Sequence, residues 1–230
     1  RSHRVIVPDH PVFGLSSQTP YKAPFASNTV RYLLGFMDAL GIQNADVVAL
    51  SLGAQMALAM SIEHPSRVNR LIVIGSSGLG RKFPLLYKVA NVPVLGKLIV
   101  RPNRWGQDNY FKTMEVVDYK FDDAAAYKQY TYDVTLTTGH AAAMRSSISV
   151  ITDFGGQKSV FTDAELQAIE VPTMAIWGDG DPLFPLRHGY RLQRLVPNST
   201  LHVIENARHV PILDHPDEVN TLITGFLAAG

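Results

Sequence analysis

Three residue types that act together in nucleophilic catalysis occur along this chain in the order serine, aspartate, histidine. Ser51 lies in the motif A-L-S-L-G, Asp179 and Asp181 lie in W-G-D-G-D-P, and His209 lies in N-A-R-H-V-P. A serine hydroxyl is a weak nucleophile near neutral pH, so it requires a base, and the base requires an acceptor that orients it. The three motifs together predict catalysis by an activated serine.

The motif around Ser51 has the sequence context of a sharp turn between a strand and a helix. An apolar strand is expected to end at Leu50, and a helix is expected to follow. Small residues are needed two positions before and after the serine, where Ala49 and Gly53 stand, because the turn brings both against neighbouring backbone. Taken alone, the motif also fits an ordinary N-cap serine of a helix.

The segments that must position these residues have the sequence pattern of an α/β protein. Five short apolar runs predict buried strands, at 5–7, 47–50, 71–74, 173–177 and 201–204. Segments with helical periodicity lie between them, at 30–40, 56–63 and 219–227. This alternation predicts a mainly parallel sheet flanked by helices, with ligands at the carboxyl ends of the strands.

One long segment without a strand pattern interrupts the alternation of strands and helices. After Gly75-Ser76-Ser77-Gly78 no strand pattern returns until Val171, and the intervening residues have helical spacing. We therefore expect a helical cap over residues 80–156, inserted between two parts of a core at 1–79 and 157–230. Residues 154–157 are the expected hinge.

Composition excludes several classes of function. Lysine and arginine number 21 against 20 aspartate and glutamate, so no excess charge favours nucleic acid. There is no cysteine, and the eight histidines form no metal-binding pattern, so we expect neither a metal nor another cofactor. No apolar run is long enough for a membrane-spanning segment. The expected partner is a small-molecule substrate, and the expected location is cytoplasmic.

With the motifs at 5–17, 49–53, 177–185 and 209–216, nearly the whole chain resembles the α/β-hydrolase superfamily. The resemblance assigns the acid to Asp181 rather than Asp179 and the base to His209, although Arg208 replaces the usual glycine. It implies that Ser51 attacks a carbonyl, that His209 transfers the proton, and that Asp181 holds the imidazole. The backbone N–H of Leu52 is the expected oxyanion donor.

The resemblance also implies that part of the fold is absent. A strand and the loop that supplies a second oxyanion donor normally precede the segment resembling residues 4–9, and no such motif precedes it. That strand would lie between the strands at 5–7 and 47–50. We therefore expect an N-terminal segment or a second chain to complete the sheet.

The serine at the elbow leaves several hydrolytic reactions open. Cleavage of a carboxylic ester, by a carboxylesterase or lipase-like enzyme, is the leading expectation. The alternatives are carbon–carbon hydrolysis of aromatic ring-fission products, which residues 28–41 and 75–80 resemble, and a hydrolase-fold protein that binds without turnover. For the carbon–carbon alternative, Arg104, Trp105 and Arg145 are candidate ligands of a substrate carboxylate, although each is also compatible with a surface or packing role.

Overall fold

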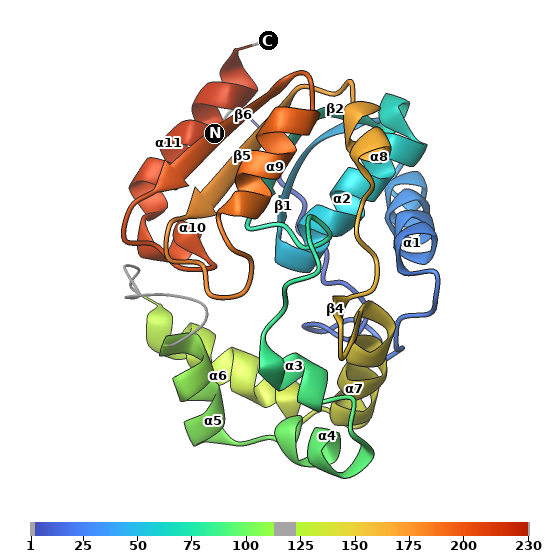
Figure 1. Ribbon diagram of the computed structural model, residues 1–230, viewed down its shortest axis with the longest axis vertical. Coiled ribbons are helices and arrows are strands. Elements are labelled where there is room, and N and C mark those ends of the chain that lie inside the picture. The colour runs from blue at the N-terminus through green and yellow to red at the C-terminus, as the bar shows by residue number, and fades with distance from the viewer. Residues whose placement is uncertain (1–2, 113–122, 230) are drawn as a thin grey trace.

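A four-stranded parallel sheet forms the centre of the molecule. The computed structural model describes residues 3–112 and 123–229 (Figure 1). The strands are ordered β1 (Ala45–Leu50), β2 (Val68–Ile74), β5 (Thr173–Gly178) and β6 (Ser199–Ile204) across the sheet, and each neighbouring pair is parallel. The predicted mainly parallel sheet is confirmed, and four of the five predicted strands are present.

Helices cover both faces of this sheet. Successive side chains of a strand point to opposite faces. On one face, Leu71, Val73, Ala175 and Trp177 pack in a buried cluster with residues from helices α1 (Phe25–Ala39), α2 (Ser51–Glu63), α8 (Asp163–Gln167) and α9 (Arg187–Leu195). On the other face, Ile72, Ile74, Met174 and Ile176 pack against α11 (Pro216–Ala228). Two short helical turns, η1 (Pro65–Arg67) and α10 (Pro211–Asp214), complete the connections.

Five further helices lie beyond one end of the sheet. They are α3 (Leu85–Val89), α4 (Pro93–Ile99), α5 (Arg104–Tyr110), α6 (Ala124–Thr135) and α7 (His140–Ile151), and Figure 1 shows them grouped apart from the core. A two-stranded hairpin of β3 (Thr152–Asp153) and β4 (Gly156–Gln157) follows and contains the expected hinge. The division into core and cap stays a prediction, but these elements occupy the interval assigned to the cap.

The chain crosses between sheet and cap helices twice, and the two crossings are bonded to each other. Phe161 N donates to Gly78 O at 2.9 Å, and Gln157 N donates to Arg81 O at 3.0 Å. The side chain of Gln157 also accepts a hydrogen bond from Gly78 N at 2.7 Å. We call this bonded pair, residues 78–81 and 157–161, the stem.

The prediction of a strand at residues 5–7 is wrong. Val5 is 78% exposed and Val7 is 85% exposed, and neither lies in the sheet. The physical reason is that a strand needs a neighbour for its backbone hydrogen bonds, and β1 pairs only with β2 among the described residues. β1 is therefore a sheet edge, where Val48 is 44% exposed. The segment or second chain expected at this edge stays a prediction.

Candidate active site

The carboxyl ends of the four strands meet at one edge of the sheet. Leu50 pairs with Ile74, and Ile74 pairs with Ile176. Gly178 at the end of β5 pairs with Ile204 at the end of β6. The loops that follow these strands therefore lie side by side, and they carry Ser51, Asp181 and His209.

Ser51 begins helix α2 in a strained backbone conformation. Its φ is +56°, in the left-handed region that non-glycine residues rarely adopt. Such a conformation typically costs about 1–3 kcal/mol and persists where the surrounding structure enforces it. Here the Ser51 carbonyl accepts a hydrogen bond from Ser77 N at 3.2 Å. This geometry is that of the sharp strand-to-helix turn predicted from the sequence.

Asp181 and His209 form a buried pair on the loops after β5 and β6. His209 Nδ1 lies 2.9 Å from Asp181 Oδ2, and the side chains are 4% and 0% exposed respectively. Asp181 Oδ1 also accepts hydrogen bonds from Leu183 N at 2.8 Å and Phe184 N at 2.9 Å. Asp179, the alternative acid in the same motif, is exposed. An acceptor on Nδ1 leaves Nε2 of the same ring as the atom that can exchange a proton with a hydroxyl.

Phe184 links this pair to the core. Its ring lies edge-on to the His209 imidazole with 5.3 Å between centroids. Its carbonyl accepts a hydrogen bond from the buried indole of Trp177 at 2.8 Å. Since its N–H bonds to Asp181, Phe184 contacts both members of the pair and anchors them to β5.

Gly75 places the pair next to the Ser51 turn. It follows β2, the strand adjacent to β1, and has a φ of +50°. A Cβ added there would lie 3.2 Å from Asp181 Oδ2 and 3.2 Å from His209 Nδ1. The same loop reaches Ser51 through Ser77. One short loop therefore contacts all three residues of the predicted triad.

Leu52 and Arg208 are the other two residues that the sequence predicts to affect this site. Leu52 lies in the first turn of α2, where backbone N–H groups lack intrahelical partners. Arg208, which replaces the expected glycine, has no positive φ, so this position does not require glycine. Its N–H donates to Asp214 Oδ2 at 3.0 Å. An arginine is therefore compatible with the loop that carries His209.

A second buried histidine near the site was not predicted. His188 on α9 is 3% exposed, and its ring lies 6.5 Å from that of Phe184. Burial, and then the charge of Arg187, lower the pKa of His188 to about 4, although Asp181 opposes this shift. His188 is therefore neutral near pH 7. The signal in the sequence was its spacing from Leu192 and Leu195, which marks the buried face of α9.

Of the three candidate carboxylate ligands, Arg104 is engaged by other side chains. The Arg104 guanidinium lies 4.1 Å above the Tyr132 ring and also donates to Gln129 at 3.0 Å. Trp105 is 75% exposed, and Arg145 packs beside Gly96 of α4. In the part of the chain described here, no group of three or more histidine, aspartate and glutamate residues is arranged to hold a metal ion. No described helix is long and apolar enough to cross a membrane.

Comparison with known proteins gives relatives over nearly the whole chain. The model of the alpha/beta hydrolase family matches residues 1–222. The chain is 30% identical to a 2-hydroxy-6-oxo-6-phenylhexa-2,4-dienoate hydrolase of Burkholderia cepacia, over 99% of the chain and 78% of that protein. It is 26% identical to a 2-hydroxymuconate semialdehyde hydrolase of Pseudomonas putida, with the same coverage. These comparisons and the sheet topology confirm the predicted α/β-hydrolase fold.

A solved structure gives the same result for the fold. The 2-hydroxy-6-oxo-6-phenylhexa-2,4-dienoate hydrolase of a Rhodococcus strain superposes with a TM-score of 0.79 at 18% identity. The superposition covers 95% of the chain and 77% of that structure.

These relatives correct the leading prediction of function. Ester cleavage by a carboxylesterase or lipase-like enzyme is wrong as the main prediction, because the similar curated proteins are named as dienoate and semialdehyde hydrolases that cleave carbon–carbon bonds. The broader prediction of a hydrolase is supported. The error has a chemical reason: both reactions start from a carbonyl group, so the order of serine, aspartate and histidine does not distinguish them.

Proposed function

Because the chain belongs to the alpha/beta hydrolase family, we propose that it hydrolyses a carbon–carbon bond in a 2-hydroxy-6-oxo-dienoate, a product of aromatic ring fission. The observation that carries this proposal is the match, over 99% of the chain, to hydrolases named for such substrates. The buried Asp181–His209 pair beside the Ser51 turn supports it, since these groups have the chemistry that attack on a carbonyl requires. A cytoplasmic location stays a prediction.

We propose the following roles for the three residues. Ser51 adds to the 6-oxo carbon, His209 accepts the hydroxyl proton, and Asp181 holds the imidazolium that forms. The Leu52 N–H, at the start of α2, stabilises the oxyanion. Binding without turnover, the remaining alternative, typically accompanies the loss of one of these groups, and this chain has all three.

Carbon–carbon cleavage also requires a place for the electron pair of the broken bond. In the 2-oxo tautomer of the substrate, electrons released from the bond between carbons 5 and 6 pass through the conjugated system to the carbonyl oxygen at carbon 2. Carbon 6 then remains bonded to Ser51 as an acyl-enzyme, and water displaces the Ser51 oxygen, which recovers its proton. Carbon 6 thereby receives the hydroxyl of one water molecule and becomes a carboxylic acid, and the dienol receives the hydrogen. The contact between His209 and Asp181 supports the proposal that His209 delivers the protons in these steps.

The test is hydrolysis of 2-hydroxy-6-oxo-6-phenylhexa-2,4-dienoate, followed by loss of its visible absorbance and by the appearance of benzoate. We expect turnover by the unmodified chain and a fall in kcat of about 10³-fold or more in Ser51→Ala. Ser27→Ala, on an exposed position of α1, is the matched control and should retain activity. Equal rates in Ser51→Ala and the unmodified chain would refute the role of Ser51.

A second substrate separates the remaining outcomes. Turnover of 4-nitrophenyl acetate without turnover of the dienoate would contradict the carbon–carbon assignment. Tight binding of the dienoate with no product from either substrate, in a folded sample, would instead support a binding protein.

A further inference from the structure

The side chain of Gln55 joins the helix that begins at Ser51 to the stem. Gln55 lies on α2, one helical turn after Ser51, and is only 3% exposed. Its Oε1 accepts a hydrogen bond from the Ser77 hydroxyl at 2.7 Å, and its Nε2 donates to the Ser159 carbonyl at 2.7 Å. One buried amide therefore bonds to both chain segments that run between the sheet and the cap helices.

The stem is tightly packed where this amide meets it. Gly78 has a φ of +80°, and a Cβ added there would lie 2.8 Å from Gln55 Cγ and 2.9 Å from the Phe161 ring. The backbone of the stem therefore lies directly against the Gln55 side chain. The buried Gln157, which accepts from Gly78 N, also donates to Gly80 O at 2.7 Å. Since the two segments are cross-linked here, a shift of one displaces the other.

The bonds of this amide also reach the backbone of the Ser51 turn. Ser77 is buried, and its N–H donates to Ser51 O while its hydroxyl donates to Gln55. The positive φ of Ser51 needs surroundings that enforce it. Through Ser77 the Gln55 amide contributes to those surroundings, and through Ser159 it holds the chain that returns from the cap helices.

A hydrogen-bonded amide fixes a position more narrowly than an apolar side chain of the same size. Apolar contacts have no preferred direction, whereas a hydrogen bond weakens steeply as its angle departs from linear. The neighbours of Gln55 along α2, Ala54 and Met56, are buried and apolar. Packing of this helix therefore does not require a polar residue at position 55, and the two directed bonds are what the amide adds.

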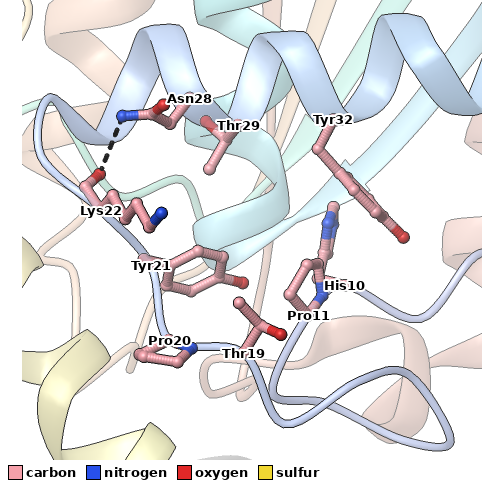
Figure 2. Close-up of a pocket in the computed structure, with 9 residues that line it drawn as sticks. All are labelled: His10, Pro11, Thr19, Pro20, Tyr21, Lys22, Asn28, Thr29 and Tyr32. Carbon is pink, nitrogen blue, oxygen red and sulfur yellow. Dashed lines mark hydrogen bonds between the residues drawn. The ribbon is translucent and has the colours of Figure 1, made fainter.

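The cap helices have a second contact with the core, through the loop of residues 10–22. Tyr21 N donates to Ser147 Oγ on α7 at 3.1 Å. Figure 2 shows His10 and Tyr21 of this loop facing helix α1 across a pocket of about 190 Å³. None of these contacts involves Gln55. Without the Gln55 bonds the cap helices would stay attached at this loop, so the expected result is a shift of the stem and not detachment.

We propose that Gln55 is a positioning residue, which sets the distance between the Ser51 turn and the cap helices through its bonds to Ser77 and Ser159. The reaction that it affects rests on the proposed function. Without these bonds the groups that bind the substrate are all retained, but their alignment with Ser51 changes. A misplacement of about 1 Å can lower a rate about 10²-fold, so kcat should depend on Gln55 more strongly than KM does.

The first experiment compares dienoate turnover by Gln55→Met, whose side chain has a similar length but forms neither bond, with that of the unmodified chain. We expect kcat per active site to fall about 10-fold to 100-fold and KM to change less than about 3-fold. Complete labelling of Ser51 with a fluorophosphonate counts the sites. Gln193→Met, an exposed change on α9, is the matched control. An unchanged kcat per site in Gln55→Met would mean a purely structural role and overturn the proposal.

A milder variant tests the same bridge. Ser77→Ala removes one hydroxyl and should lower kcat about 3-fold to 10-fold, less than Gln55→Met does. The double variant should be no more impaired than Gln55→Met alone, because both changes break the same bond. Ser61→Ala removes a buried hydroxyl that bonds within α2, to Ala57 O, and is the control. Unchanged kcat in Ser77→Ala, or additive effects in the double variant, would overturn the proposal.

Hydrogen exchange tests the bridge without a substrate. In Gln55→Met, amide exchange in peptides that cover residues 75–82 and 157–162 should become at least about 10-fold faster, while peptides from β5 stay unchanged. Faster exchange in the stem, with no dienoate turnover by the unmodified chain, would contradict the proposed function but support the bridge. Unchanged exchange in the stem would overturn the bridge, whatever the substrate.

Discussion

On the β5–β6 side of the site, Asp181 and His209 lie in a closed network: both are buried, they contact each other, and Phe184 ties them to the core. On the β1 side, Ser51 has a strained conformation and directly follows β1, which pairs only with β2 among the described residues. The proposed acid and base are therefore held by burial and hydrogen bonds, whereas the proposed nucleophile is held by the backbone of a turn. This difference predicts that mutations in the two regions will affect activity and stability in different proportions.

The nucleophile side should show the largest effect on activity with no loss of stability. Ser51→Gly and Ser51→Ala should both lower turnover of the dienoate, by up to about 10⁶-fold. Glycine adopts a positive φ without steric cost, so Ser51→Gly should have a free energy of unfolding about 1 kcal/mol above that of Ser51→Ala. Urea unfolding measures the difference. Equal stability of the two variants would mean that the turn does not store strain.

The acid side should combine a smaller loss of activity with a loss of stability. Asp181→Asn should lower kcat about 10⁴-fold, because an amide cannot stabilise the imidazolium and favours the wrong tautomer. It also removes the charge that the Leu183 and Phe184 N–H groups bond to, so the free energy of unfolding should fall by about 1–2 kcal/mol. Asp179→Asn, an exposed change in the same motif, is the control. If Asp179→Asn were the more damaging change, the acid would be misassigned.

Substitution of Gly75 tests whether the loop that contacts both the Asp181–His209 pair and the Ser51 turn must keep its shape for activity. In Gly75→Ala the new Cβ would lie 3.2 Å from atoms of both Asp181 and His209, at a φ that alanine disfavours. We expect turnover to fall about 10-fold to 100-fold because displacement of about 1 Å in an active site has effects of this size. Gly35→Ala, where a Cβ meets nothing within 4 Å, is the matched control. Retained activity in Gly75→Ala would show that the pair can shift without consequence.

His188 extends the buried side of the comparison through the pH dependence of stability. Its pKa is lowered to about 4 in the fold. The unfolded chain therefore takes up a proton near pH 6.5 that the folded chain does not take up until near pH 4, so stability falls as the pH falls through this range. The loss is at most about 3 kcal/mol. Free energies of unfolding at pH 7 and pH 5 should show less pH dependence in His188→Gln than in His202→Gln. The same slope in both variants would contradict the shift.

The sequence predicted the parts of the fold that depend on local patterns. The second half of β2 and most of β5 are apolar runs because both of their faces are covered, and α1 and α11 show a clear apolar periodicity. Residues 5–7 have the same apolar character, but an apolar run carries no information on whether a neighbouring strand is present to pair with it. Helix α9 was missed because only one narrow face is buried, and its other positions are polar or charged.

The site could be predicted as residue types but not as contacts. The motifs indicated Ser51, His209 and the pair Asp179 and Asp181 because each follows a predicted strand, and the resemblance to α/β-hydrolases selected Asp181 from that pair. Gly75 and Phe184 could not be found in this way, since their roles come from packing between loops that are distant in the sequence. The substrate class also could not be derived, because it depends on the cap and on chemistry that the triad motifs share across many hydrolases.

The stem has a consequence for how this enzyme can diversify. Its two segments enter and leave the cap side by side and are held together by backbone hydrogen bonds. Insertions are tolerated best where the two ends of a segment lie close together. The residues between the two segments therefore form a unit that recombination at this point can replace, while the residues proposed to perform the reaction keep their positions.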